Sequence, residues 1–180
     1  EYIENNVFAH CESLQGIQVS AEHPSYVSVE GVLFDKRLET LLLCPGGKEG
    51  EYVIPDGVKA IEKRAFRSCH RLASIIIPDS VTAIDRSTFY GCYNLTHIEI
   101  PNSVTRIGGY AFFGSGLTNV VIPNSVTNIG NNVFDECINL ESIVIGSGMT
   151  AINRRSFSGC ENLKEIWVVE ENPNYSSSDG

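Results

Sequence analysis

Apolar and polar positions recur along the chain in a pattern that repeats about every 23 residues. In the stretch LASIIIP, Leu72, Ile75 and Ile77 follow the spacing L-x-x-I-x-I, and the last alternation has the two-residue period of a strand with one buried face. Pro78 is expected to end that strand, because proline has no backbone N–H for a β-ladder. The pattern therefore predicts one short strand per repeat.

The second part of each repeat has a different pattern. The stretch DSVTAIDRSTFYGC begins with turn-forming residues and then places Val81 and Ile84 at positions expected to face inward. Phe89 and Cys92 are three residues apart, which is the spacing of one short helical turn. We therefore expect short helical or 3₁₀ turns opposite the strands.

The repeats predict a stacked architecture. Pro55, Pro78, Pro101 and Pro123 follow one another at intervals of 23, 23 and 22 residues, and the short interval has GSGL where its neighbours have SCHRL or GCYNL. One such unit cannot bury its own apolar face, so consecutive units must stack into a solenoid. Five units occupy residues 54–169, and a partial unit occupies residues 1–19.

Two further segments resemble each other. The stretch YVSVEGVLF and the stretch ETLLLC flank the polar residues DKRL, which predicts a β-hairpin insert over residues 20–53. HPSYVSVEG at residues 23–31 is matched by NPNYSSSDG at residues 172–180, so residues 170–180 are interpreted as the start of a second insert. The alternative is a serine-rich tail. We expect residues 1–180 to be a single domain taken from a longer array.

The repeat sequence also resembles a known family. The unit IPNSVTRIGGYAFFGSGLTNVVIP is similar to the BspA-like, or treponemal, class of leucine-rich repeats, and this resemblance covers nearly the whole chain. It implies a curved, right-handed α/β leucine-rich-repeat solenoid, with short parallel strands on the concave side and helical or 3₁₀ turns opposite. It also implies a secreted or cell-surface bacterial protein involved in adhesion to host proteins or to other cells.

Charge and composition exclude some functions. The net charge of -9 argues against nucleic-acid binding, which needs lysine and arginine to neutralise phosphates. No run of 18 apolar residues exists to insert into a membrane. The four histidines are scattered over different units, so no catalytic site, metal site or cofactor is expected.

The six cysteines have two interpretations. In an extracellular protein they suggest disulfides. However, one repeat position holds Cys11, Cys69, Cys92, Cys137 and Cys160, with Ser115 in the short unit, which favours a buried column of free thiols. Cys44 lies outside that position and has no evident partner in the sequence. It is therefore the cysteine to test for reactivity.

The strand pattern predicts two outward columns of side chains. One contains Gln18, Val53, Ile76, Glu99, Val121, Val144 and Trp167, and its neighbour contains Gly16, Glu51, Ser74, His97, Asn119, Ser142 and Glu165. Aligned exposed apolar groups are typical of an interaction surface. The candidate ligand-binding residues on this concave face are Val53, Ile76, His97, Glu99, Asn119, Val121, Val144, Glu165 and Trp167. Strand propensity alone, self-association, or cover by a neighbouring segment would also explain the apolar column.

The sequence thus predicts a non-catalytic binding or adhesion module of a secreted or cell-surface protein. Its expected partner is a protein ligand of the extracellular matrix or of a cell surface, with self-association as the other partner considered. The alternatives are a structural spacer that presents other domains, and an accessory domain of a larger surface enzyme.

Overall fold

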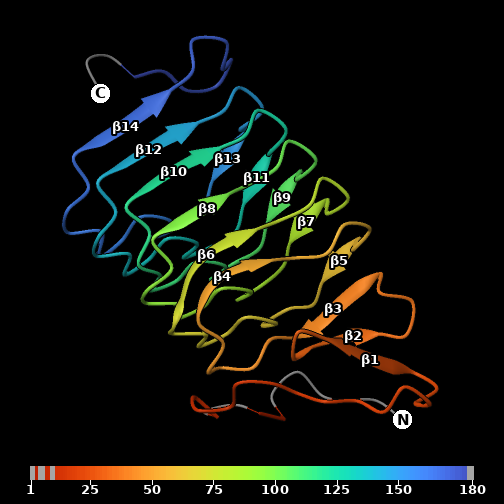
Figure 1. The fold of residues 1–180 in the computed structure, drawn as a ribbon. Coiled ribbons are helices and arrows are strands. Elements are labelled where there is room, and N and C mark those ends of the chain that lie inside the picture. Colours follow the sequence, from red (N-terminus) through yellow and green to blue (C-terminus); the bar gives the residue numbers. More distant parts are fainter. Residues whose placement is uncertain (1–2, 4–6, 9–10, 178–180) are drawn as a thin grey trace.

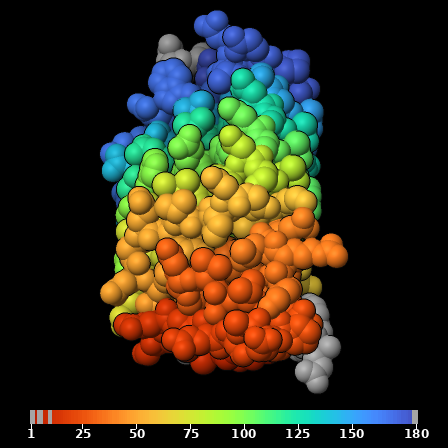
Figure 2. Space-filling view, turned by 45° about the vertical axis from the view of Figure 1, so that its right-hand side comes forward, coloured from red at the N-terminus to blue at the C-terminus, as the bar shows by residue number. Residues whose placement is uncertain are grey.

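The computed structural model describes residues 3, 7–8 and 11–177. The chain winds as a β-solenoid whose coils are stacked in chain order from one end of the molecule to the other (Figures 1 and 2). The described residues form 14 strands. This arrangement confirms the predicted repeat solenoid.

One strand per unit builds the larger parallel sheet, called here the long-strand sheet. Its members are β4 (Gly50–Val53), β6 (Leu72–Ile76), β8 (His97–Glu99), β10 (Asn119–Ile122), β12 (Ser142–Ile145) and β14 (Glu165–Val168). The hydrogen-bonded ladders run in two groups, β4-β6-β8 and β10-β12-β14. All of the ladders are parallel, as predicted.

A second row of very short strands lies beside the first (Figure 1). It contains β5 (Ala60–Ile61), β7 (Ala83–Ile84), β9 (Arg106–Ile107), β11 (Asn128–Ile129) and β13 (Ala151–Ile152). The last four form one parallel sheet, whereas β5 pairs with the insert. Ile84 is buried as expected, but a strand of two residues is too short for its period to be recognised in the sequence.

The expected helical or 3₁₀ turns are wrong: the described residues contain no helix. In the first full unit Arg64 and Ser68 have φ of 65° and 60°, which interrupts helical backbone geometry. Phe66, between them, donates its N–H to the Thr88 carbonyl of the next coil at 3.0 Å. Alternate backbone N–H groups on this side therefore bond between coils, and those between them close isolated turns to the residue three positions earlier, so no helix continues. Later units repeat the positive φ at Ser87, Tyr110, Asn132 and Arg155.

A stack of phenyl rings runs through the core. Phe66, Phe89, Phe112 and Phe134 are fully buried, and Phe157 extends the stack at the last unit. Successive ring centroids lie 5.2, 5.4, 5.3 and 5.8 Å apart. The F of each repeat thus fills the same position in every coil, and burying a ring of this size stabilises the fold by about 1.5–3 kcal/mol.

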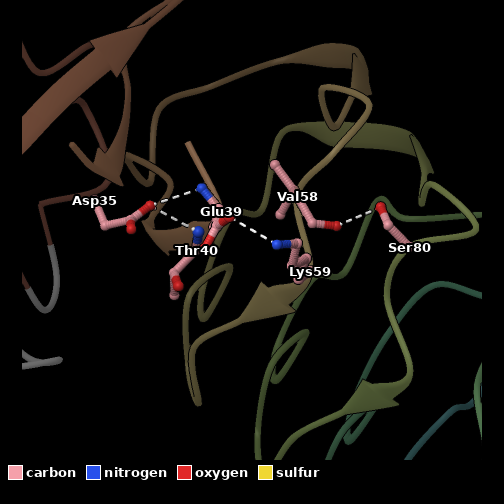
Figure 3. A network of polar contacts seen from close by, with 6 residues as sticks. All are labelled: Asp35, Glu39, Thr40, Val58, Lys59 and Ser80. Carbon is pink, nitrogen blue, oxygen red and sulfur yellow. Dashed lines mark hydrogen bonds and ion pairs between the residues drawn. The ribbon is translucent and has the colours of Figure 1, made fainter. Parts of the chain in front are cut away.

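Serine hydroxyls link the coils at the turn after each proline. The side chains of Ser80, Ser103 and Ser125 donate to the carbonyls of Val58, Val81 and Val104. These O···O distances are 2.6, 2.7 and 2.7 Å. Figure 3 shows the first of them. The S of the SVT motif therefore satisfies a carbonyl of the preceding coil.

The insert has one more hairpin than the sequence predicted. β1 (Tyr26–Val29), β2 (Val32–Asp35) and β3 (Thr40–Leu43) form an antiparallel meander. Glu30 and Gly31, with φ of 49° and 82°, make a tight turn that divides the expected single strand YVSVEGVLF into two. The hairpin around DKRL is present as predicted, between β2 and β3.

The turn between β2 and β3 attaches the insert to the first coil (Figure 3). Asp35 Oδ1 accepts the backbone N–H groups of Glu39 and Thr40, both at 2.8 Å. Glu39 then forms an ion pair with Lys59, with an N···O distance of 2.7 Å. β3 also pairs in parallel with β5, the first short strand of the repeats. The insert is thus joined to the solenoid through both side chains and backbone.

The two resembling segments have the same local structure. His23 Nδ1 accepts the N–H of Tyr26 at 3.1 Å, and Asn172 Oδ1 accepts that of Tyr175 at 2.9 Å. Two residues after each tyrosine, a serine hydroxyl accepts a backbone N–H from nine positions earlier at 3.1 Å. This match supports the proposal that residues 170–180 begin a second insert, although its last three residues lie outside the described part of the chain.

Candidate functional site

The predicted columns are aligned on the long-strand sheet. Ladder partners are Val53 with Ile76 and Ile76 with Glu99 in the first group of strands. In the second group, Val121 pairs with Val144 and Val144 with Trp167. The neighbouring column is aligned in the same way, with Ser74 beside His97, Asn119 beside Ser142, and Ser142 beside Glu165.

The apolar column is open to solvent at most of its positions. Ile76 is 45% exposed, Val121 63% and Trp167 43%, whereas Val144 between the last two is half-buried. Their strand neighbours Ile75, Val120 and Ile143 are buried, so each strand alternates between the core and this face. The geometry therefore leaves large apolar groups on the surface of the sheet.

The columns are shorter than the sequence suggested. Gly16 and Gln18 are exposed but belong to no strand. The Ile17 N–H between them donates to the Gly31 carbonyl of the insert at 2.8 Å instead of joining a ladder with β4. The insert occupies the edge where the partial unit would have paired, so the columns begin at Glu51 and Val53.

A hollow of about 430 Å³ opens on this face where β8 and β10 meet. This sheet hollow is lined by four candidate residues, His97, Glu99, Asn119 and Val121, together with Ile98, Ile100, Asn102 and Pro123. Its walls thus combine an imidazole, a carboxylate and an amide with apolar surface. A few polar groups on an otherwise apolar wall are typical of a binding site.

The short unit accounts for the position of the sheet hollow. The Thr118 N–H meets the Thr96 carbonyl of the preceding coil at a long 3.4 Å, whereas the Glu141 N–H meets the Thr118 carbonyl at 2.7 Å. In the described structure β10 does not continue the ladder of β8, and this break lies at the strand that follows the shortened GSGL. The sequence located the deletion, but it did not indicate that the deletion would open the sheet.

Hydrogen bonds hold the polar column in place. The Ser142 hydroxyl donates to Asn119 Oδ1 at 2.6 Å, and the Trp167 indole N–H donates to the Glu165 carboxylate at 2.9 Å. The indole N–H of Trp167 is therefore already hydrogen-bonded. This bond restricts rotation of the Trp167 side chain before a ligand arrives, so less conformational entropy is lost on binding.

The cysteines are free thiols, and most of them are buried. Cys69, Cys92 and Cys137 lie in the core. Burial raises the pKa of the Cys137 thiol to about 12. Cys137 Sγ donates to the Phe112 carbonyl at 3.0 Å. The thiol column is thus a structural feature in these units.

Two cysteines differ from the expectation. Cys11 is exposed rather than part of the buried column. Cys44, the candidate for reactivity, is 4% exposed and lies beside Cys69, whose pKa is raised by its hydrogen bond with Cys44 and by burial. The insert brings Cys44 to the end of the column because β2 and β3 pack on the first coil.

Neither a metal-binding cluster nor a membrane-spanning helix occurs among the described residues. In residues 3, 7–8 and 11–177, no group of three or more His, Cys, Asp or Glu side chains is arranged to hold a metal ion. The same residues include no helix of the length and apolar character needed to cross a membrane.

Comparison with known families decides the classification. Residues 50–175 match the model of the BspA type leucine rich repeat region in six copies. This chain belongs to the BspA-type leucine-rich-repeat family. The matched residues include every strand of both repeat rows and begin where β4 begins. The resemblance seen in the IPNSVT units is therefore confirmed.

Solved structures of other bacterial proteins share this fold. A leucine rich cell surface protein of Faecalibacterium prausnitzii is 35% identical with a TM-score of 0.84, and the match covers 97% of this chain and 45% of that chain. The pneumococcal vaccine antigen PcpA is 27% identical with a TM-score of 0.81, and the match covers 88% of this chain and 40% of that chain. The leucine rich repeat protein of T. pallidum is 26% identical with a TM-score of 0.54, over 83% of this chain and 81% of that chain.

The chain spans less than half the length of the first two of these proteins. A search of curated proteins gave no match. The relatives are bacterial leucine-rich-repeat proteins, and a repeat solenoid of this family is consistent with a protein-interaction module.

Proposed function

We propose that this BspA-type domain is a non-catalytic binding module of a bacterial surface protein and that it recognises a protein ligand through the long-strand sheet. The observation that carries the proposal is the apolar column that ends at the sheet hollow. Val121 forms part of the hollow and is also the first member of the column that continues through Val144 to Trp167.

The chemistry of this face suits a protein ligand. Apolar side chains beside a hollow can bury an anchoring side chain of the partner, and tryptophan is enriched among residues that dominate binding energy. His97, Glu99 and Asn119 supply hydrogen-bonding groups at the rim of the hollow. An extracellular ligand is favoured because the F. prausnitzii relative is named a cell surface protein and the pneumococcal relative a vaccine antigen.

The test is a binding assay against a panel of extracellular-matrix proteins and against the chain itself. Wild type is compared with the double variant Trp167→Ala and Val144→Ser, after circular dichroism has established that both fold alike. A protein that binds the wild type should lose about 2 kcal/mol, or about thirtyfold in affinity, on the double variant, because both side chains belong to the proposed hot spot.

Leu38→Ser provides a matched control. Leu38 is also an exposed apolar residue, but it lies in the turn between β2 and β3 rather than on the long-strand sheet. Equal loss of binding in this variant would overturn the proposal, because the effect would then follow from general stickiness. If no protein of the panel binds, the structural spacer becomes the better explanation of the fold.

A further inference from the structure

The same short unit produces a second hollow, on the turn side of the solenoid. This turn hollow has a volume of about 460 Å³ and is lined by Gly114, Ser115 and Gly116 with Tyr93, Phe113, Glu136, Ile138 and Asn139. The three small residues are the GSG of the deletion. The hollow is therefore the place from which one residue and its side chain have been removed.

One ladder of side chains is interrupted at this hollow, because the short unit has glycine at the ladder position. His70 and Tyr93 occupy the position after the cysteine in consecutive units, and their rings are stacked with centroids 4.7 Å apart and planes 9° apart. The next unit has Gly116 there, and the unit after that has Ile138. Tyr93 and Ile138 are thus two coil spacings apart, about 10 Å, which leaves room for one flat group between them.

The chain cannot fill this gap itself. A Cβ on Gly116 would lie 2.1 Å from the Tyr93 carbonyl oxygen, and Gly114 has a φ of 61°. The close backbone therefore requires glycine at position 116, whereas the positive φ of Gly114 is also adopted by Ser68 and Glu136 at the same position of other units. Tyr93 is 60% exposed and Ile138 50%, so both walls of the gap are open to a ligand.

The polar groups of the turn hollow favour a cation. Glu136 is exposed, and its carboxylate makes no ion pair or hydrogen bond with the described part of the chain. The equivalent of Asn139 in the next unit, Asn162, donates to the Ile138 carbonyl at 2.7 Å, whereas the Asn139 side chain has no such partner among the described residues. Glu136 and Asn139 thus line the same hollow as Tyr93, with the Glu136 carboxylate resting near Gly159 of the following coil, where a Cβ would lie 2.9 Å from its Oε1.

Other tyrosines on this side already hold arginines. The Arg67 guanidinium lies over the ring of Tyr90 at 4.8 Å, and that of Arg86 lies over Tyr110 at 5.3 Å. In each pair the arginine comes from the coil before the tyrosine. A guanidinium stacks on an aromatic face and also matches a carboxylate with two parallel hydrogen bonds. For Tyr93 the coil before supplies His70, which stacks on the ring, whereas the coil after supplies only Gly116.

We propose that the turn hollow binds an arginine side chain of a protein partner. The guanidinium takes the place of the absent rung on Tyr93, its N–H groups donate to Glu136, and the amide oxygen of Asn139 accepts from its edge. The net charge of -9 attracts a basic partner. This site is separate from the long-strand sheet and does not depend on the function proposed for that face.

The test is an NMR titration of the isotopically labelled chain with Nα-acetyl-arginine methylamide. Shifts are expected at the amides of Gly114 to Gly116 and at the Asn139 side chain. The citrulline analogue has the same shape without the charge, and it should bind about tenfold more weakly, because it loses both the ion pair and the cation–π contact. The lysine analogue should bind more weakly than arginine, since it cannot stack as a plane.

Three variants complete the experiment. Glu136→Gln should reduce arginine affinity about tenfold and abolish the preference over citrulline. Tyr93→Leu keeps an apolar wall but loses the ring, and it should weaken binding by about fivefold. Trp167→Ala, on the other face, should leave arginine binding unchanged and thereby separates this proposal from the first.

Three results would overturn the proposal. Arginine and citrulline could bind equally, the shifts could lie outside the turn hollow, or methyl glucoside could produce larger shifts there than arginine. The last result would assign the hollow to a sugar ring, which also stacks on tyrosine. The variants' spectra show whether each remains folded, so a loss of binding cannot be confused with unfolding.

Discussion

The unit that begins at Ile100 and the unit that begins at Ile122 differ by one residue, and their surfaces differ far more than their cores. Phe112 of the short unit stacks on Phe89 at 5.4 Å, and Phe134 of the longer unit stacks on Phe112 at 5.3 Å. Outside the core, the short unit leaves a hollow on each of two faces. The strand of the longer unit, β12, instead pairs along all four of its residues with β10 on one side and β14 on the other.

This difference teaches how a repeat protein can acquire sites. The buried ladder fixes the spacing of the coils, so a deletion cannot be absorbed by bringing coils together. The deletion instead changes the exposed turn and the exposed strand, which lose backbone pairing and side chains. Irregular units of a solenoid are therefore the places to search for ligand sites, because regular units fill their own surface.

The first prediction concerns the common core. Phe112→Ala and Phe134→Ala should each lower the free energy of unfolding by about 4 kcal/mol, because each removes a fully buried ring from an unbroken stack. Denaturant unfolding measures both. If Phe112→Ala lowers the free energy of unfolding much less than Phe134→Ala, the core of the short unit is loosely packed. The two units would then differ in their cores as well as on their surfaces.

The second prediction concerns the glycines of the short unit. Gly116→Ala should destabilise the fold by about 3 kcal/mol, because the new Cβ would overlap the Tyr93 carbonyl and force the backbone apart. Gly91→Ala is the matched substitution in a regular unit. Nothing lies closer than 3.8 Å to its Cβ, so only the cost of φ at 71° remains, about 1 kcal/mol. If thermal unfolding shows the same loss of stability for Gly116→Ala and Gly91→Ala, the close approach at Gly116 is contradicted.

A third prediction restores the regular length. Insertion of asparagine between Gly116 and Leu117 gives GSGNL, which has the length of GCYNL in the preceding unit. The repaired unit should join β10 to β8 and slow amide hydrogen exchange in these strands by about tenfold, equivalent to about 1.4 kcal/mol of local opening. Unchanged exchange would mean that the deletion is not the cause of the break between β8 and β10.

How much of this could be predicted from the sequence depends on which interaction fixes each feature. The strand pattern and the proline spacing predicted the coils and both outward columns, because an inward residue in one coil is inward in all. The predicted helical turns were wrong, because positive φ at Ser87 and at Gly91 interrupts helical geometry on both sides of Phe89, although Phe89 and Cys92 have helical spacing. Local spacing does not reveal bonding to a neighbouring coil.

The candidate site was predicted only in part. His97, Glu99, Asn119 and Val121 were identified from strand alternation, but nothing in that alternation brought them together around a hollow. The turn hollow was missed, although the shortened GSGL was visible in the alignment. A deletion within an otherwise constant period is the signal that could have found it, provided that the position of the lost residue in the coil is considered.

The fourth prediction uses pH to compare the thiols of regular units with Ser115 of the short one. Burial raises the pKa of Cys137 from 9.0 to about 12 and that of Cys92 well above 9.0. The unfolded chain loses these protons first as pH rises, so stability is complete below pH 9 and falls between about 9 and 12. One pH unit above the ordinary thiol pKa, each buried thiol should lower the free energy of unfolding by about 1.4 kcal/mol. Cys137→Ser should flatten this slope in alkaline unfolding curves, and an unchanged slope would assign it to other groups.

The smallest expected effect comes from completing the thiol column in the short unit. Ser115 is buried, and its hydroxyl lies 3.3 Å from Cys137 Sγ. Ser115→Cys replaces the hydroxyl with a slightly larger thiol at a position that is cysteine in the adjoining units, so neutral-pH stability should change by less than about 1 kcal/mol. The alkaline slope should instead become steeper, because one more buried thiol now loses its proton on unfolding. If the substitution costs several kcal/mol, the core of the short unit does differ from that of its neighbours, and the one-residue deletion has reached further inward than the ring stack indicates.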